Sequence, residues 1–246
     1  MHKTLSRRRV LAALGALGAV PFVTRELCLN VASAAPAPIV TGKSCVLSPA
    51  MMEGPFFVDT GLNRSDLTTG TTKAGVVQGL PVVLNIDLAS VQATGCVPIA
   101  GMQVDVWHAD ATGEYSGVAG GASQSNAAGQ AFLRGYQVSD ANGRVTFKTI
   151  YPGWYPGRTI HIHVKARLFN AAGNTTYVFT SQLFFDDAVS DKVMAMPPYN
   201  ARGARNVRNA GENIYGNTTR ALVDLRPADG ARGYAGAVTL GFRLPA

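Results

Sequence analysis

The sequence predicts an all-β protein, a single-domain β-sandwich of short antiparallel strands joined by long loops. Several short segments alternate apolar and polar residues, which is the pattern of a half-buried strand. Gly, Pro, Asn and Asp separate these segments, as they do at tight turns. After the first 34 residues, no window longer than ten residues has a convincing helical periodicity. Many short strands separated by turn residues are typical of a sandwich or a barrel.

The individual strands can be placed by their patterns. Leu84, Ile86 and Leu88 alternate strictly with polar neighbours in the first of them. The strand predicted at residues 160–168 has the clearest pattern, and the one at residues 177–185 is long, apolar and aromatic. Residues 186–233 are rich in Gly, Asn and Arg with weak patterning, so we expect long loops there. In chain order, the predicted strands occupy residues 84–88, 102–107, 145–147, 160–168, 177–185 and 238–244.

Residues 1–34 have the features of a twin-arginine-type signal peptide. Arginines 7–9 precede an apolar run that ends at Val23, and the small residues 32–34 suit a cleavage site. This run of about fourteen residues is shorter than the roughly 17–25 that span a bilayer, so an uncleaved membrane anchor is the lesser alternative. We therefore expect an exported protein, periplasmic or extracellular, with no stable membrane insertion after processing. Residues 35–50 are expected to form a linker and N-terminal segment, and residues 51–246 the β-sandwich domain.

The charge of the mature chain gives no indication of a nucleic-acid partner. The full sequence has 22 basic and 15 acidic residues and a formal charge of +7. Residues 1–34 contain five of the basic and one of the acidic residues, so 17 and 14 remain and the formal charge falls to +3. No Lys/Arg run and no interleaved aromatic and basic pattern remains after residue 34. We expect no nucleic-acid partner, and the remaining length suits one all-β domain.

The cysteines fit an oxidising compartment. Cys28 would leave with the signal peptide, so Cys45 and Cys96 remain as an even pair that could form a disulfide. Two unpaired buried thiols are the alternative. The sequence has no CxxC motif and no Cys/His cluster, which disfavours a zinc–thiolate site.

The predicted strand at 160–168 carries a candidate metal pair. Its apolar residues, from Ile160 through Leu168, share one face, which must be the core side. His161 and His163 share the other face, about 6.5–7 Å apart along the backbone. Two imidazoles at this spacing can bind one metal ion, although a polar outer face is the more frequent explanation of such a pair. The neighbouring segments therefore decide between the two interpretations.

Those segments carry further motifs in a specific order. Tyr155 and Arg158 lie just before the histidines in P-G-W-Y-P-G-R, and Tyr115 ends the earlier segment V-W-H-A-D-A-T-G-E-Y. E-G-P-F-F at 53–57 precedes them, and S-Q-L-F-F at 181–185 follows. The whole series resembles the intradiol ring-cleavage dioxygenases, the family of the protocatechuate and catechol dioxygenases. It is most similar to the shorter, exported members.

The resemblance implies a non-haem Fe(III) centre. Tyr115 and Tyr155 would be its two tyrosinate ligands, the second departing when substrate binds, and His161 and His163 its two neutral imidazole ligands. This donor set is chemically sensible, because phenolates supply negative charge that favours Fe(III) over Fe(II). Ferric iron in turn acts as a Lewis acid that lowers the pKa of a bound catechol.

The resemblance also implies the reaction and its catalytic residues. Residues 51–246 would form a catalytic domain that cleaves a catechol with O2 between its two hydroxylated carbons, giving a muconate-type diacid. Arg158 matches the arginine that stabilises negative charge on the ring, a role suited to a permanently charged side chain. Gln182 matches a glutamine that hydrogen-bonds within the pocket, and the Tyr155 phenolate could take up a substrate proton. A homodimer is also implied by the resemblance.

Two departures from the family pattern concern the substrate. Gly157 stands where the protocatechuate enzymes have tryptophan, in a shortened segment, and Phe56 and Phe57 stand where tyrosine is frequent. Both features are expected to shape the pocket. An open pocket in an exported enzyme would suit bulky or varied catechols, such as lignin-derived ones.

Other interpretations of these residues are less well supported by the sequence. A secreted β-sandwich binding module that has lost the iron chemistry is the main alternative, but the tyrosines, histidines and arginine are all present. An Fe(II) facial triad needs a carboxylate near the histidines, and none occurs between Val145 and Phe185. Copper or zinc could occupy the two histidines in purified material. His108 is expected to be a hydrogen-bonding structural residue, and Trp107 and Trp154 are expected to be packing residues.

Overall fold

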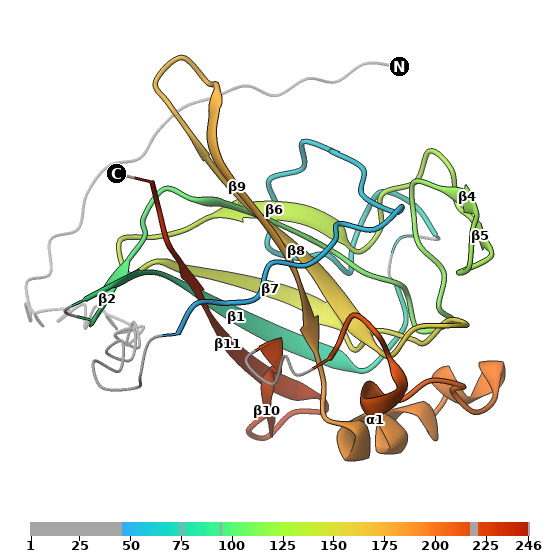
Figure 1. Ribbon diagram of the computed structural model, residues 1–246. Helices are drawn as coiled ribbons and strands as arrows, with labels where there is room; N and C mark the ends of the chain where they lie inside the picture. Colours follow the sequence, from blue (N-terminus) through green and yellow to red (C-terminus); the bar gives the residue numbers. More distant parts are fainter. Residues whose placement is uncertain (1–45, 74, 76, 94, 217–220, 246) are drawn as a thin grey trace, which may run out of the picture. The chain divides into compact units, whose positions relative to one another are not determined.

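The computed structural model describes residues 46–245 apart from positions 74, 76, 94 and 217–220 (Figure 1). The expected signal peptide, and the linker up to residue 45, lie outside the described residues. No helix among the described residues is long and apolar enough to cross a membrane. Cys96 is disulfide-bonded. Cys45 lies outside the described residues, so its pairing with Cys96 stays a prediction.

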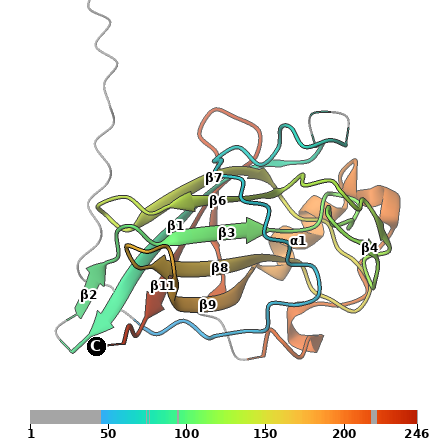
Figure 2. The ribbon, with the colours of Figure 1, turned by 90° about the horizontal axis from the view of Figure 1, so that it is seen from above.

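Two large β-sheets confirm the predicted all-β sandwich (Figures 1 and 2). In the five-stranded sheet the order is β10-β11-β1-β2, with β7 also paired to β1; in the four-stranded sheet it is β6-β3-β8-β9. The five-stranded sheet contains β1 (Pro81–Gln92), β2 (Gly95–Pro98), β7 (Arg144–Ile150), β10 (Asp224–Pro227) and β11 (Tyr234–Phe242). The four-stranded sheet contains β3 (Gln103–Trp107), β6 (Arg134–Val138), β8 (His161–Phe169) and β9 (Thr175–Phe184), and β4 (Ala119–Gly120) pairs with β5 (Ser125–Asn126).

The strand ladders are antiparallel with one exception. Among the described strands only β1 and β11 pair in parallel, from Val82 opposite Tyr234 to Ser90 opposite Phe242. A parallel pair needs a long connection, and here most of the domain separates the two strands in sequence. β1 is also longer than expected, because its first half pairs with β7 and its last residues pair with β2.

The hydrophobic core contains the inward faces of both large sheets. The alternating residues that predicted the strands are buried in it, among them Leu84 and Ile86 of β1 and Ile162 and Val164 of β8, each fully inaccessible to solvent. Because side chains alternate along a strand, this burial fixes the register and turns the odd-numbered residues of β8 to the opposite face of the sheet. That opposite face carries the histidine pair.

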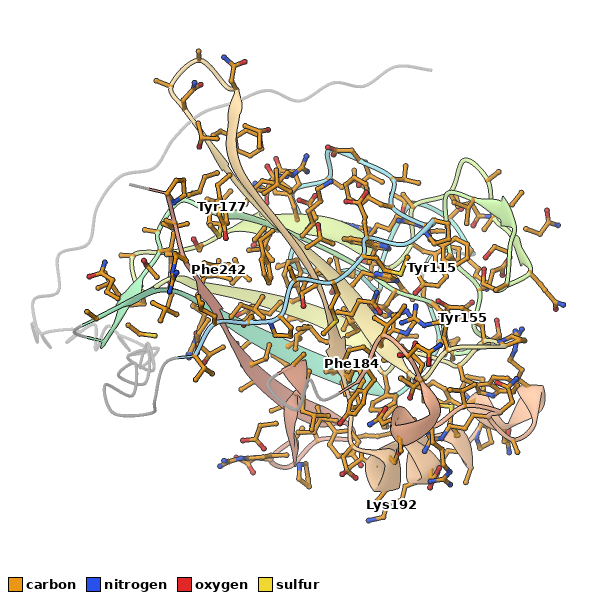
Figure 3. All side chains as sticks on the ribbon, in the orientation of Figure 1. Tyr115, Tyr155, Tyr177, Phe184, Lys192 and Phe242 are labelled. Atoms are coloured by element: carbon orange, nitrogen blue, oxygen red, sulfur yellow. The ribbon has the colours of Figure 1, made fainter. Side chains whose placement is uncertain are left out.

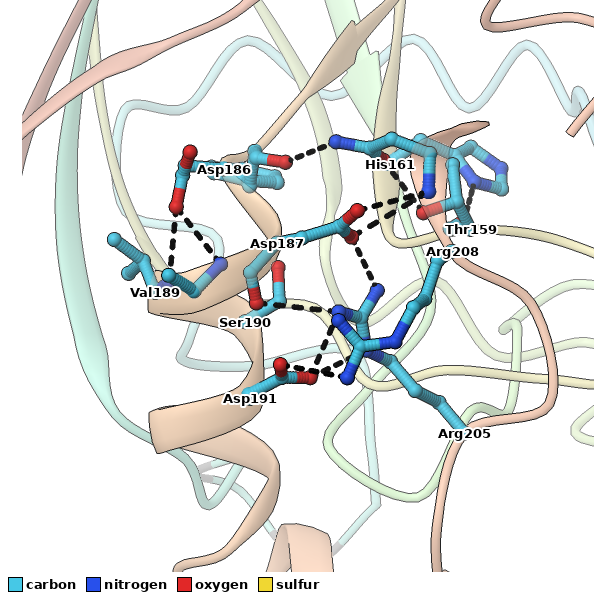
Figure 4. A network of polar contacts seen from close by, with 12 residues as sticks. Thr159, His161, Asp186, Asp187, Val189, Ser190, Asp191, Arg205 and Arg208 are labelled. Atoms are coloured by element: carbon cyan, nitrogen blue, oxygen red, sulfur yellow. Dashed lines mark hydrogen bonds and ion pairs between the residues drawn. The ribbon is translucent and has the colours of Figure 1, made fainter. Parts of the chain in front are cut away.

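Residues 186–233 contain more regular structure than expected. The long loops predicted there are interrupted by helix α1 (Asp187–Met194), by two 3-10 turns, η1 (Tyr199–Arg202) and η2 (Asn209–Gly211), and by β10. α1 begins after Asp186, whose side chain accepts hydrogen bonds from the backbone of Ala188 and Val189 (Figure 4). A helix of eight residues has too few turns to show a clear periodicity, which explains why the pattern did not reveal it.

An N-terminal segment, residues 46–63, crosses the outer face of the four-stranded sheet. Met51 N donates to Thr180 O on β9, Glu53 pairs with Lys165 on β8 at 2.6 Å, and a β-bridge joins Asn63 to Tyr136 on β6. The segment therefore contacts the sheet from one edge strand to the other. It covers the face on which His161 and His163 lie.

Candidate active site

The two histidines predicted on β8 lie side by side in the interior. His161 is 3% exposed and His163 is 1% exposed, and their Nε2 atoms are 3.1 Å apart. A polar outer face would leave both side chains in water, so this alternative is wrong. The covering N-terminal segment supplies the burial, and Gly54 of that segment approaches the ring of His163. A β-carbon at Gly54 would lie 3.2 Å from His163 Cε1.

Hydrogen bonding and stacking orient the two imidazoles. His161 Nδ1 lies 2.7 Å from Thr159 O, so Nδ1 is the donor and Nε2 carries a lone pair. His163 stacks flat on Trp107, with ring centroids 4.8 Å apart and planes at 7°. Burial lowers the pKa of His161 to about 3 and holds the pKa of His163 well below its usual value. Both rings are therefore neutral at ordinary pH, so each could donate a nitrogen lone pair to a metal ion.

Two buried tyrosines converge on the same atom from two different loops. The hydroxyls of Tyr115 and Tyr155 each lie 3.3 Å from His161 Nε2, and Figure 3 shows the two tyrosines close together. Burial raises the pKa of Tyr115 well above its usual value, and it also raises the pKa of Tyr155, against the lowering effect of Arg158. Both phenols are therefore protonated at neutral pH in the absence of a bound cation.

The loops that carry the tyrosines are packed backbone against backbone. Gly153 N donates to Asp110 O at 2.9 Å, and a β-carbon at Gly153 would collide with that same carbonyl. A β-carbon at Gly113 would likewise collide with Trp154 O. Only glycine permits this approach from both sides. It explains why each tyrosine motif contains a glycine two residues before the tyrosine.

The loop before Tyr115 is held by ion pairs and hydrogen bonds. Asp110 Oδ1 accepts from the backbone of Thr112 and Glu114, and Lys73 pairs with both Asp110 and Glu114. Tyr115 N donates to Ser125 Oγ at 2.8 Å. Lys73 was not predicted, because a lysine about forty residues from its acidic partners gives no local signal in the sequence.

The two phenylalanines expected to shape the pocket have different positions. Phe56 stacks on Tyr115 with ring centroids 4.6 Å apart and meets Tyr155 edge-on. Phe57 instead packs edge-on against Trp107, with Lys165 Nζ 4.1 Å from its ring centroid. Phe56 thus contacts the tyrosines, whereas Phe57 supports the tryptophan that stacks on His163. Gly157 is exposed, and a side chain there would meet open space.

Arg158 and Gln182 also reach the cluster. Arg158 Nη1 lies 3.4 Å from the Tyr155 hydroxyl and 3.3 Å from His161 Nε2, and Nη2 donates to Gln182 Oε1. Gln182 is fully buried and donates to Met52 O at 3.0 Å. Every predicted site residue is therefore brought together in one place.

One site residue was not predicted. Glu212 forms an ion pair with Arg158 Nε from a loop 54 positions further along the chain. The only available signal was indirect: a part-buried arginine needs an acidic partner, and residues 145–185 contain none.

His108 has the structural role expected of it. Its Nε2 lies 2.6 Å from Thr149 Oγ1 and its Nδ1 lies 2.8 Å from Ala109 O, so hydrogen bonds use both ring nitrogens. Trp107 and Trp154 are buried packing residues, as expected. The described residues contain no group of three or more His, Cys, Asp or Glu side chains that could hold a metal ion. The candidate centre is instead a set of two phenol oxygens and two imidazole nitrogens.

Comparisons with known proteins show the family. The fold and the site define a β-sandwich oxidoreductase, and a model of the dioxygenase family matches residues 52–197. The chain belongs to the intradiol ring-cleavage dioxygenases. It is similar to the intradiol ring-cleavage dioxygenase from Tetranychus urticae, with 30% identity, a TM-score of 0.67, and coverage of 81% of this chain and 95% of that one.

Two other solved structures extend the comparison. The dioxygenase domain of a dioxygenase–carbohydrate-binding protein fusion from Streptomyces sp. SirexAA-E is 28% identical, with a TM-score of 0.57 over 81% of this chain and all of that one. The 3-chlorocatechol 1,2-dioxygenase from Rhodococcus opacus 1CP is 19% identical, with a TM-score of 0.53 over 79% of this chain and 71% of that one, and this likeness shows the fold alone. No curated protein matches the sequence.

Proposed function

We propose that this protein is a non-haem Fe(III) intradiol dioxygenase that cleaves catechol-type aromatics with O2 between the two hydroxylated carbons. The products would be muconate-type diacids. The observation that carries the proposal is that two buried phenol oxygens and the buried Nε2 atom of His163 all lie close to His161 Nε2. Tyr115, Tyr155, His161 and His163 would be the four metal ligands.

The residues present fit ferric iron. Phenolate oxygen and imidazole nitrogen suit this ion, and two phenolates would offset two of its three positive charges. The His163 Nδ1 atom is buried without a hydrogen-bond partner among the described residues, and a ring held by stacking and by a metal at Nε2 needs no such partner to be oriented. When bound, ferric iron would supply Lewis acidity toward the catechol hydroxyls.

The residues around the ligands have distinct roles in the proposal. The Tyr155 phenolate can take up a proton from a catechol hydroxyl, because its unperturbed pKa of about 10 suits that exchange. Arg158 Nη1, next to the Tyr155 oxygen, would stabilise negative charge on the ring. Gln182 connects Arg158 to the backbone at Met52 and would keep the polar side of the pocket ordered. Phe56 stacks on Tyr115 and Trp107 stacks on His163, and these contacts would exclude water from the two ligands.

The test is a visible absorption spectrum of the purified, iron-loaded protein before and after anaerobic addition of catechol. The proposal predicts a red-brown tyrosinate-to-iron band that shifts when catechol is added, followed by ring cleavage when O2 is admitted. The matched control is the His161→Ala/His163→Ala double variant, which should be colourless under the same loading. A wild-type protein that stays colourless after ferric loading would contradict the proposal and favour a binding module that has lost the iron chemistry.

For the substrate, we propose bulky or varied catechols, such as lignin-derived ones. The open space beside Gly157 supports this proposal, because the residue is exposed and has no neighbour that a side chain would meet. A panel of catechols with increasing 4-substituents would test it. Turnover of catechol and protocatechuate, with none of any bulkier catechol, would contradict it.

We also propose export by the twin-arginine route and a homodimeric assembly. The arginines at 7–9 and the short apolar run support export. Replacing Arg7 and Arg8 with lysine should retain the protein in the cytoplasmic fraction, whereas Arg25→Lys should not. Light scattering of the mature protein would test the dimer, and a mass equal to one chain would contradict it.

A further inference from the structure

We propose that Glu212 is a positioning residue that holds the guanidinium of Arg158 in its working orientation. The inference rests on the proposed function, and it adds a residue to that function from a loop outside the family-model match at 52–197.

Two of the three guanidinium nitrogens of Arg158 are held by acceptors, and the third faces the site. Nε pairs with Glu212 Oε1, and Nη2 donates to Gln182 Oε1. Nη1 lies 3.4 Å from the Tyr155 hydroxyl and 3.3 Å from His161 Nε2. A guanidinium is planar, so acceptors at Nε and Nη2 fix both its position and its plane. Nη1 is thereby directed at the place where charge would change during the reaction.

Glu212 is itself firmly held. Its side chain is 3% exposed, against 16% for Arg158, and its Oε2 accepts from Tyr215 N at 2.7 Å. Each carboxylate oxygen therefore has a donor, one on Arg158 and one on the following turn. Such a buried carboxylate is stable only when it is paired in this way.

The loop that carries Glu212 is anchored to the site and to α1. Thr159 Oγ1 donates to Asn209 Oδ1 at 2.7 Å, and Asn209 Nδ2 donates to Phe185 O at 2.8 Å. Thr159 is also the residue whose carbonyl orients His161. The loop therefore contacts Thr159, the residue that follows Arg158, through Asn209, which lies three positions before Glu212.

A second set of contacts ties the same loop to the helix. Arg205 pairs with Asp187 at 2.6 Å and with Asp191 at 2.8 Å, and Arg208 pairs with Asp191 at 2.8 Å (Figure 4). These tethers fix where the loop delivers its carboxylate. Because electrostatic stabilisation of a transition state depends on donors fixed in advance, loss of Glu212 should reduce the rate while leaving the metal in place.

The experiment compares Glu212→Gln, Glu212→Asp and the control Asp105→Asn in iron-loaded protein. Asp105 forms a similar buried pair with Arg167 on the same sheet but contacts no site residue. Iron content and the tyrosinate band should match wild type in all three variants. With catechol, kcat per bound iron should fall about 10- to 100-fold in Glu212→Gln, the size typical of a misplaced group, and recover partly in Glu212→Asp. The anaerobic Kd for catechol should change less than threefold, and Asp105→Asn should keep the wild-type kcat.

A double-variant cycle separates positioning from a general effect on folding. Because Glu212 acts through Arg158, Glu212→Gln should lower kcat less than twofold further when Arg158 is already Met. An equal loss in both backgrounds, or a kcat per iron within twofold of wild type in Glu212→Gln, would overturn the proposal. Loss of iron with normal kcat for the remaining iron would also overturn it. The wild-type protein is the reference for each outcome. If it does not bind iron or cleave catechol, the proposed function fails, whatever the Glu212 variants do.

Discussion

The Nε2 atoms of His161 and His163 lie 3.1 Å apart in the interior of the protein. His161 Nδ1 donates to Thr159 O, so its Nε2 presents a lone pair to its neighbours. The hydroxyls of Tyr115 and Tyr155 lie at 3.3 Å from that same atom. A cation among these four atoms could be bound by all of them together, whereas the single Nε2 lone pair of His161 cannot accept a full hydrogen bond from both hydroxyls at once.

Ferric loading should release protons from the tyrosines and not from the histidines. The raised pKa values of Tyr115 and Tyr155 mean that both phenols carry protons at neutral pH and must lose them to bind as phenolates. The lowered pKa values of the histidines, about 3 for His161, mean that both rings are already unprotonated. Iron affinity should therefore rise with pH through the neutral range. Indicator-dye titration with ferric nitrilotriacetate should show about one proton fewer for Tyr155→Phe than for wild type, and equal release would contradict the ligand role.

Replacing Tyr155 with Phe should reduce turnover far more than it perturbs the fold. The variant loses a ligand and the proton acceptor beside Arg158, so kcat per bound iron should fall by about 100-fold or more. Its tyrosinate band should weaken but persist, because Tyr115 remains. Tyr151→Phe is the matched control: this buried hydroxyl contacts Ser190 and no site residue, so kcat per iron should be unchanged at a cost of about 1 kcal/mol in stability. Unchanged turnover in Tyr155→Phe would refute its role.

Replacing Gly54 with Ala should weaken metal binding through His163. Gly54 has φ +76° and a β-carbon there would press on His163 Cε1. Gly61 has φ +61° with nothing nearby, so Gly61→Ala introduces similar backbone strain without the contact. Both variants should lose about 1–2 kcal/mol of unfolding free energy in denaturant titrations. Only Gly54→Ala should also lose iron affinity, by about tenfold. Equal iron affinity in the two variants would show that the segment does not help to place His163.

Replacing Arg158 with Lys should separate charge from geometry. Lysine keeps a positive charge but lacks the planar fork that reaches Glu212, Gln182 and the site together. We expect kcat for catechol to fall about 100-fold while anaerobic catechol binding changes little, because the lost interaction stabilises charge that develops during the reaction. A proportional rise in KM with normal kcat would assign Arg158 to substrate binding alone.

Local patterning was sufficient to predict the sandwich. Each of the six predicted strands overlaps a strand of the structure, and Leu84, Ile86 and Ile162 are buried as their alternation required. Alternation gives this information because one face of each strand must contact the core. The strands β2, β4, β5, β6 and β10 were not predicted; each has only two to five residues, and none of them alternates apolar and polar residues clearly. Helix α1 was missed for the same reason.

The sequence by itself determined the residue types of the site and their order along the chain. Tyr115, Tyr155, His161 and His163 were all identifiable, because each lies in a short motif with a fixed spacing from a strand or turn. Only the tertiary structure decided that the histidine face of β8 is buried, through the covering segment at 46–63, and that Glu212 pairs with Arg158. Both depend on contacts between segments far apart in sequence. Such contacts form where the folded chain excludes water, and no periodicity or local spacing records them.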